Sequence, residues 1–154
     1  MTSLKTNLKS DLTTAIRERH EVKAATLRMA LTAITHEEVA GEQARVLTDD
    51  EVVTILGREA KKRRESATAF DAAARPELAE RERAELVVLE GYLPTQLSDD
   101  EIATIVSAAV ASAAAHGAEG PRAMGSVMKL VTPQVAGRAD GGQVAALVKA
   151  ALSS

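Results

Sequence analysis

Five basic side chains lie close together near the middle of the sequence, and their type and spacing could bind phosphate groups. They are Arg58, Lys61, Lys62, Arg63 and Arg64, within the segment GREAKKRRESATAF. At about 100° per residue, one face of a helix is shared by Arg58, Lys61, Lys62 and Glu65, and exposed cations on one face can contact the phosphates of a nucleic acid. Charge runs are more often solvated helix faces with internal ion pairs, here Glu59–Arg63 and Lys61–Glu65. The residues alone leave both interpretations open.

Arg63 differs from its basic neighbours because it falls within an apolar stripe of the same helix, between Ala60 and Ala67. A guanidinium on a packed face needs a partner, since a buried and unpaired charge is costly. The sequence therefore predicts either a carboxylate partner from another helix or a groove that opens at Arg63.

A second candidate site lies in MGSVMKLVTPQVAGRADGGQVAALVK, residues 124–149. Thr132–Pro133 should kink or end the first helix of this segment. The stretch from Gly137 to Gly141 is then a tight connection that presents Arg138. Backbone N–H groups at the start of the next helix could receive a phosphate beside Arg138. The alternative is that Asp140 simply caps that helix and occupies the same position.

No arrangement typical of an enzyme occurs in the sequence. It contains no cysteine, no P-loop, no G-x-G-x-x-G and no G-x-S-x-G, and His20, His36 and His116 lack metal-ligand spacing. We expect His36 to be solvated and His116 to cap a helix end. The adjacent carboxylates Glu37–Glu38 and Asp99–Asp100 make no convincing acid–base pair. The sequence thus predicts no catalytic residue, no metal site and no cofactor.

These residues must be positioned by helices, because apolar residues recur at spacings of three and four, as in Leu4, Leu8, Leu12 and Ile16. No segment alternates as a strand does. We predict an all-α fold with seven helices, at residues 3–18, 22–41, 49–73, 77–90, 99–116, 121–136 and 141–152.

Punctuation residues set these helix boundaries. Capping-box patterns mark three helix starts, at Thr48–Glu51, Ser98–Glu101 and Asp140–Gln143. Glycines mark three helix ends, at Gly41, Gly117 and Gly137. The clearest boundary is GYLPTQ, residues 91–96, because a proline disfavours helix for the residue before it. The sequence predicts a four-helix, bundle-like domain at residues 1–94 and a small three-helix domain at residues 95–154.

Composition limits the classes of function. The net charge is −3 and the pI is about 5.7, which argues against general polyanion binding, so any nucleic-acid contact must come from a local patch. Phe70 and Tyr92 are the only aromatic residues. The absence of cysteine, of a secretory signal and of a long apolar stretch favours a cytoplasmic protein that does not enter a membrane.

Several motifs along almost the whole chain resemble the YqeY family, and the C-terminal part resembles the tail domain of GatB, the B subunit of the tRNA-dependent amidotransferase. The matching motifs are LRMAL at 27–31, EAKKRRES at 59–66, YLPTQL at 92–97, MGSVM at 124–128 and GRADG at 137–141. The last two, in this order and eight residues apart, are the most specific. Within these motifs, a structural role rather than a contact role is expected for Glu59, Arg63, Met124, Gly125, Gly137, Asp140 and Gly141.

The resemblance implies a bacterial helical module connected with tRNA, because the GatB tail helps to engage the tRNA body. Carried onto this chain, the candidate RNA-facing residues are Arg58, Lys61, Lys62, Arg64, Lys129, Arg138 and Lys149. The implied partners are tRNA and a tRNA amidotransferase or aminoacyl-tRNA synthetase, with no DNA. Scarcity of aromatic stacking platforms favours recognition by shape and phosphate contacts.

Two other functions remain open on the sequence. The first is a protein-interaction adaptor without RNA contact, which the net negative charge favours. The second is a carbon–nitrogen ligase with glutamine as amido-N-donor, an activity with which families of this type are associated. Such an enzyme needs a glutaminase and a site that activates a carboxylate, and the sequence offers neither, so a shared tail transfers binding rather than a reaction.

Overall fold

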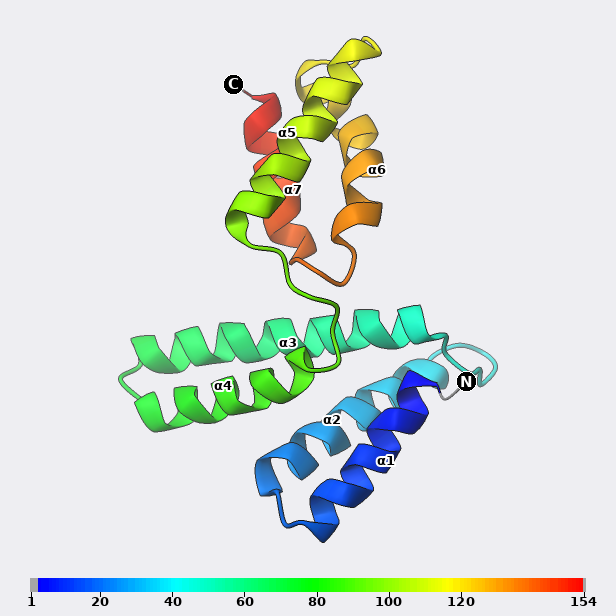
Figure 1. Cartoon of the computed structure of the whole chain (residues 1–154), viewed down its shortest axis with the longest axis vertical. Helices are drawn as coiled ribbons and strands as arrows, with labels where there is room; N and C mark the ends of the chain where they lie inside the picture. The colour runs from blue at the N-terminus through cyan, green and yellow to red at the C-terminus, as the bar shows by residue number, and fades with distance from the viewer. Residues whose placement is uncertain (1–2, 154) are drawn as a thin grey trace. The chain divides into compact units, whose positions relative to one another are not determined.

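The computed structural model describes residues 3–153, and within this range it contains helices and no strand, so the predicted all-α class is confirmed (Figure 1). The chain divides into two compact units, Met1–Leu93 and Pro94–Ser154. The first unit holds α1 (Leu4–Arg17), α2 (Glu21–Glu38), α3 (Asp49–Ala72) and α4 (Pro76–Glu90). The second holds α5 (Asp99–Ala115), a 3-10 helix (Gly120–Ala123), α6 (Met124–Val135) and α7 (Gly141–Leu152).

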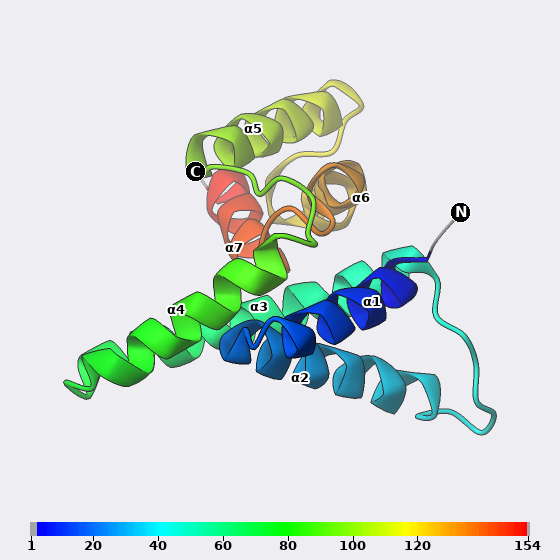
Figure 2. The same ribbon diagram turned by 60° about the horizontal axis from the view of Figure 1, so that its bottom comes forward.

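In the first unit, α1 and α2 form one antiparallel hairpin and α3 and α4 form another (Figures 1 and 2). Both views show that the end of the second hairpin that carries the α3–α4 turn extends beyond α1 and α2. The buried apolar core of this unit consists of Leu8, Leu27, Ala30, Ile34, Leu47, Val52, Ile55, Leu56, Ala60 and Leu89. Ile16, expected in the α1 stripe, is instead 49% exposed, because Ala15 takes the buried position in the last turn.

The second unit packs its helices through small and β-branched side chains. Its buried residues are Ile102, Val106, Ala109, Ala113, Ala123, Val127, Val131, Val135, Val144, Val148 and Leu152. Pro133 lies inside α6, which continues to Val135, so the helix does not end at Thr132–Pro133. In the last turn, proline removes only the one hydrogen bond that its own N–H would make, and the helix tolerates this loss.

Two of the three predicted capping boxes are confirmed. Thr48 and Ser98 each accept a hydrogen bond from the third helical N–H, and Glu51 and Glu101 reach back to the cap residue. Hydrogen bonds from the N–H of Thr48 and from the side chain of Arg45 hold the pKa of the Glu51 carboxyl below its usual range.

The third capping box and one helix end differ from the prediction. Asp140 accepts from the N–H of Gly142, and Gln143 donates to Asp99 Oδ1 at 3.1 Å instead of reaching back. Asp140 thus caps the helix start as expected, whereas Gln143 bonds to α5 instead of to the cap residue. Helix α2 ends at Glu38, so Gly41 lies three residues beyond the helix end that it was expected to mark.

Tyr92 ties the segment after α4 to α1, because its hydroxyl donates to Asp11 Oδ2 at 2.5 Å. Burial, together with the neighbouring carboxylate, raises the pKa of the Tyr92 phenol, so this group stays protonated and remains a donor. One of the two aromatic residues therefore supports the fold of the first unit rather than offering a stacking surface.

The α3–α4 turn holds Ala74 in the left-handed region of the backbone, at φ 57°. The N–H of Ala74 donates to Asp71 O and the N–H of Arg75 to Phe70 O, which are the two bonds of a Schellman motif. Glycine normally occupies this position because a Cβ is strained there. We therefore expect Ala74→Gly to raise the free energy of unfolding of the first unit by about 1 kcal/mol in urea denaturation.

The matched control for this substitution is Ala73→Gly, one residue earlier at φ −86°. No left-handed strain is relieved there, so it should lower the free energy of unfolding by about 0.5–1 kcal/mol through added freedom of the unfolded chain. Equal losses of stability in the two variants would contradict the assigned strain.

Among residues 3–153, no single helix has the length and apolar composition to cross a membrane. In the same range, α5 and the segment Gly120–Val135 reach this length and apolar composition only when they are taken together, and the chain bends by 104° between them.

Candidate functional site

The basic residues predicted on α3 differ in how they meet solvent. Arg58, Lys61 and Lys62 are exposed, as their shared helical face requires. Arg64 is half-buried and its Nη2 lies 3.8 Å from Glu90 Oε1 on α4. The Nζ of Lys62 lies 2.8 Å from Glu59 Oε2, one turn earlier on α3. Three of the four predicted N-terminal contact residues therefore project from one side of α3.

Arg63 lies at the centre of a buried ion-pair network between α3 and α4. Arg63 is 6% exposed, Glu59 is 7% exposed and Glu85 is 6% exposed. Arg63 Nη1 lies 3.7 Å from Glu59 Oε1, and Nε lies 3.3 Å from Glu85 Oε2 in an ion pair that lacks hydrogen-bond geometry. Nη2 donates to the sulfur of Met29 on α2 at 3.6 Å. Of the two expectations for Arg63, the structure shows a carboxylate from another helix.

The network continues to solvent through a second arginine. Arg81 Nε lies 3.5 Å from Glu85 Oε1, so the charges alternate in the order Lys62, Glu59, Arg63, Glu85, Arg81. The sequence reasoning missed both Glu85 and Arg81. Their spacing of four residues on one helix, typical of an ion pair, was the available signal.

The connection between α6 and α7 is held against the segment that precedes α5. Leu97 N donates to Arg138 O at 2.8 Å, and Gln96 Nε2 donates to Gly137 O at 3.0 Å. Arg138 itself is half-buried, and its Nε donates to Thr95 O at 3.1 Å. The guanidinium of Arg138 is therefore partly engaged in a hydrogen bond within the unit, whereas the sequence predicted only that the loop presents it.

The other predicted residues of the second unit have simple surroundings. Lys129 on α6 and Lys149 on α7 are exposed. Met124 is partly buried against the core, and Gly125 and Gly141 would have open space around an added Cβ. Gly137 has a φ of 73°, which explains a glycine at the end of α6.

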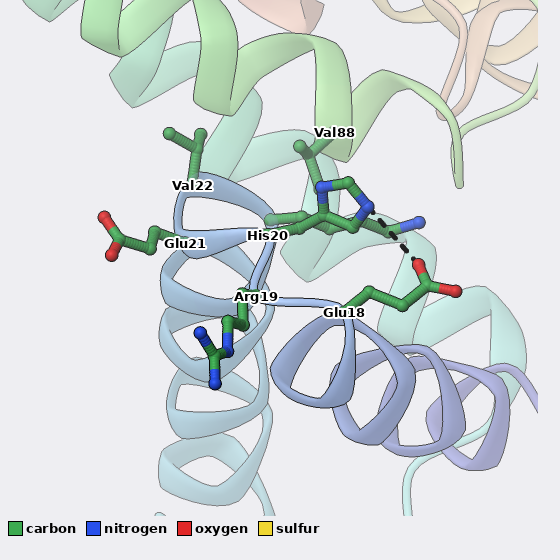
Figure 3. A pocket seen from close by; sticks show the side chains of 7 residues that line it. Glu18, Arg19, His20, Glu21, Val22 and Val88 are labelled. Atoms are coloured by element: carbon green, nitrogen blue, oxygen red, sulfur yellow. Dashed lines mark ion pairs between the residues drawn. The ribbon is translucent and has the colours of Figure 1, made fainter.

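The histidines occupy separate sites in the chain. His20 is the residue before α2, and its Nε2 lies 3.3 Å from Glu18 Oε2 in the α1–α2 turn (Figure 3). His36 is exposed, as expected. His116 follows the last residue of α5, and its Nδ1 lies 2.8 Å from Ser112 O, which fits the expected capping role. Within residues 3–153, no three His, Cys, Asp or Glu side chains gather as a metal site would require.

Two adjoining hollows lie beside the α1–α2 turn and the end of α4. The first, of about 550 Å³, is bounded by Glu18, Arg19, His20, Glu21, Val22, Lys23 and Val88 (Figure 3). The second, of about 420 Å³, shares Lys23 and Val88 and reaches Asp11 and Tyr92. Both have side chains of mixed charge on their walls. In the second hollow, the hydroxyl of Tyr92 donates to the carboxylate of Asp11.

Comparison with known proteins gives a consistent result. A family model described as Yqey-like protein matches residues 5–152. A relative, the altered inheritance of mitochondria protein 41, mitochondrial, from Pyrenophora tritici-repentis, is 31% identical over 136 residues. That match covers 86% of this chain and 71% of the relative.

Proposed function

The chain belongs to the YqeY-like family, and from this premise we propose that it is a non-catalytic helical accessory module that binds the body of tRNA. The observation that carries the proposal is the exposed row of cations on α3, Arg58, Lys61 and Lys62. Cations on one helix face can contact phosphates of the same nucleic-acid segment, and each such contact releases counterions and adds affinity. The local patch acts despite the net charge of −3.

Recognition in this proposal is by shape and phosphate contacts. Of the two aromatic residues, Tyr92 is held by a hydrogen bond to Asp11, and Phe70 is only partly exposed. The chain therefore offers few aromatic rings on which unpaired bases could stack. Folded RNA offers phosphates and 2′-hydroxyls in a fixed arrangement, and a rigid helix can read that arrangement without base contacts.

We further propose that the four-helix part, residues 1–94, and the three-helix part, residues 95–154, act as separate domains. The exposed Lys129 and Lys149 of the second part add phosphate contacts. A tRNA amidotransferase or an aminoacyl-tRNA synthetase would supply the chemistry on the same tRNA. The similarity of the C-terminal motifs to the GatB tail supports such a partner.

An adaptor without RNA contact is the second candidate, and one observation favours it. Val87 on α4 is 69% exposed and borders the hollow that Lys23, Val88 and Tyr92 line. Val87, Val88 and Tyr92 line this hollow together, and neighbouring apolar side chains, unlike a single exposed valine, can form a contact surface for a protein.

The test is a titration of purified full-length chain with tRNA at a series of salt concentrations. Each phosphate contact contributes about −0.9 to the slope of log affinity against log salt, so five exposed candidate cations give a slope as steep as about −4.5. Duplex DNA of similar length is the comparison, and we expect it to bind more weakly. Absence of salt-sensitive tRNA binding would reject the proposal and leave the adaptor.

A further inference from the structure

We propose that Arg81 and Lys62 together form a two-cation phosphate contact on one edge of the α3–α4 hairpin, held in place by the buried carboxylates of Glu85 and Glu59. This inference rests on the proposed function, and it adds a contact residue on α4, where the sequence predicted none.

The two cations lie on the same edge of the hairpin. The pairs Arg64–Glu90 and Asp71–Arg83 join one edge of α3 to one edge of α4. Arg64 and Asp71 are seven residues apart, and so are Arg83 and Glu90, which places each pair of residues on one side of its helix. Lys62 is two residues, or about 200°, from Arg64, and Arg81 is equally far from Arg83. Lys62 and Arg81 therefore both point to the opposite edge.

The edges differ in the charge that they present to solvent. The side chains of Lys62 and Arg81 are 68% and 55% exposed, whereas their partners Glu59 and Glu85 are each 9% exposed. On the other edge, cation and carboxylate are exposed alike, at 39% and 40% for Arg64–Glu90. The ion pairs of the Lys62–Arg81 edge thus expose mainly their cations to an approaching phosphate, whereas the ion pairs of the other edge expose both charges equally.

The two cations can turn from their carboxylates to a phosphate at little cost, because both carboxylates have a second cationic partner. Glu59 and Glu85 each contact Arg63 as well, so neither carboxylate is left unpaired when Lys62 or Arg81 turns towards a phosphate. The same contacts restrict the side chains before binding, which lowers the entropy cost of ordering them in a complex.

The experiment compares Arg81→Ala with Arg83→Ala in tRNA titrations of the full chain at several salt concentrations. Arg83 is the matched control, because it lies on the same helix, is 50% exposed and pairs with the exposed Asp71. We expect Arg81→Ala to weaken binding about 8-fold at 0.1 M salt and to reduce the slope by about 0.9, and Arg83→Ala to change neither. Arg81→Lys should restore most of the affinity, since a cation remains.

Each outcome decides between the claims. If the wild-type chain does not bind tRNA, the proposed function and this inference both fall. If it binds with a steep slope but Arg81→Ala and Arg83→Ala behave alike, only this inference is overturned. Arg81→Gln, which keeps the aliphatic stem and a polar end but not the charge, replaces the alanine variant if that variant unfolds, and it should show the same loss of slope.

Discussion

Arg63→Ala is expected to lower the free energy of unfolding of the first unit by about 3–5 kcal/mol, because it leaves buried carboxylates without their shared partner. Glu59 and Glu85 stay buried in this variant and retain only the exposed Lys62 and Arg81 as partners. The contact to Met29 on α2 is lost as well. Urea denaturation followed by circular dichroism measures the change.

The adjacent Arg64 supplies the control for this prediction. It is half-exposed and lies 3.8 Å from Glu90, so Arg64→Ala should cost at most about 1 kcal/mol. A second control replaces the three buried members of the network by apolar residues, Glu59→Leu with Arg63→Met and Glu85→Leu, which should be close to neutral or stabilising. If Arg63→Ala and Arg64→Ala had the same small effect, the network would not hold the hairpin together.

The double substitution Arg58→Glu and Lys61→Glu is expected to weaken tRNA binding by at least about 60-fold at 0.1 M salt, since it removes two phosphate contacts. Both residues are exposed on the side of α3 away from the buried network, so the fold should tolerate the change. Repulsion between the new carboxylates and RNA adds to the loss. Filter binding with labelled tRNA measures the affinity.

Lys9→Glu with Arg17→Glu is the matched control, because both residues are exposed on α1 and the double variant lowers the net charge of −3 by the same four units. We expect it to bind within a few-fold of wild type, because non-local charge is largely screened over about 10 Å at this salt concentration. Equal losses in the two double variants would show that net charge, and not the α3 patch, governs binding.

Local rules account for what the sequence predicted well. A short oxygen side chain followed by glutamate three residues later places a helix start, and Thr48 and Ser98 act as these rules require. The need of a buried guanidinium for a partner follows from desolvation alone, so Arg63 could be singled out without a structure. The apolar spacing placed Leu4, Leu8 and Leu12 on the core face of α1, whereas Ala15 takes the position expected for Ile16.

Contacts between segments far apart in the sequence could not be predicted in this way. Helix α4 offers several glutamates, and only its register against α3 selects Glu85 for Arg63. Arg138 was expected to be presented from its loop, but the segment before α5 lies against this loop, and Arg138 donates a hydrogen bond to Thr95 O. Helical periodicity contains no information on register or on the packing of loops. The spacing of Arg81 and Glu85 signals their own ion pair, but it does not show that Glu85 reaches Arg63.

Crosslinking of the chain to RNA in living cells, followed by sequencing of the bound RNA, tests the central claim most directly. The account predicts that tRNA sequences dominate and that the Arg58→Glu/Lys61→Glu variant loses most of them, whereas Lys9→Glu/Arg17→Glu retains them. Recovery of no tRNA above the level of the Arg58→Glu/Lys61→Glu variant would contradict it.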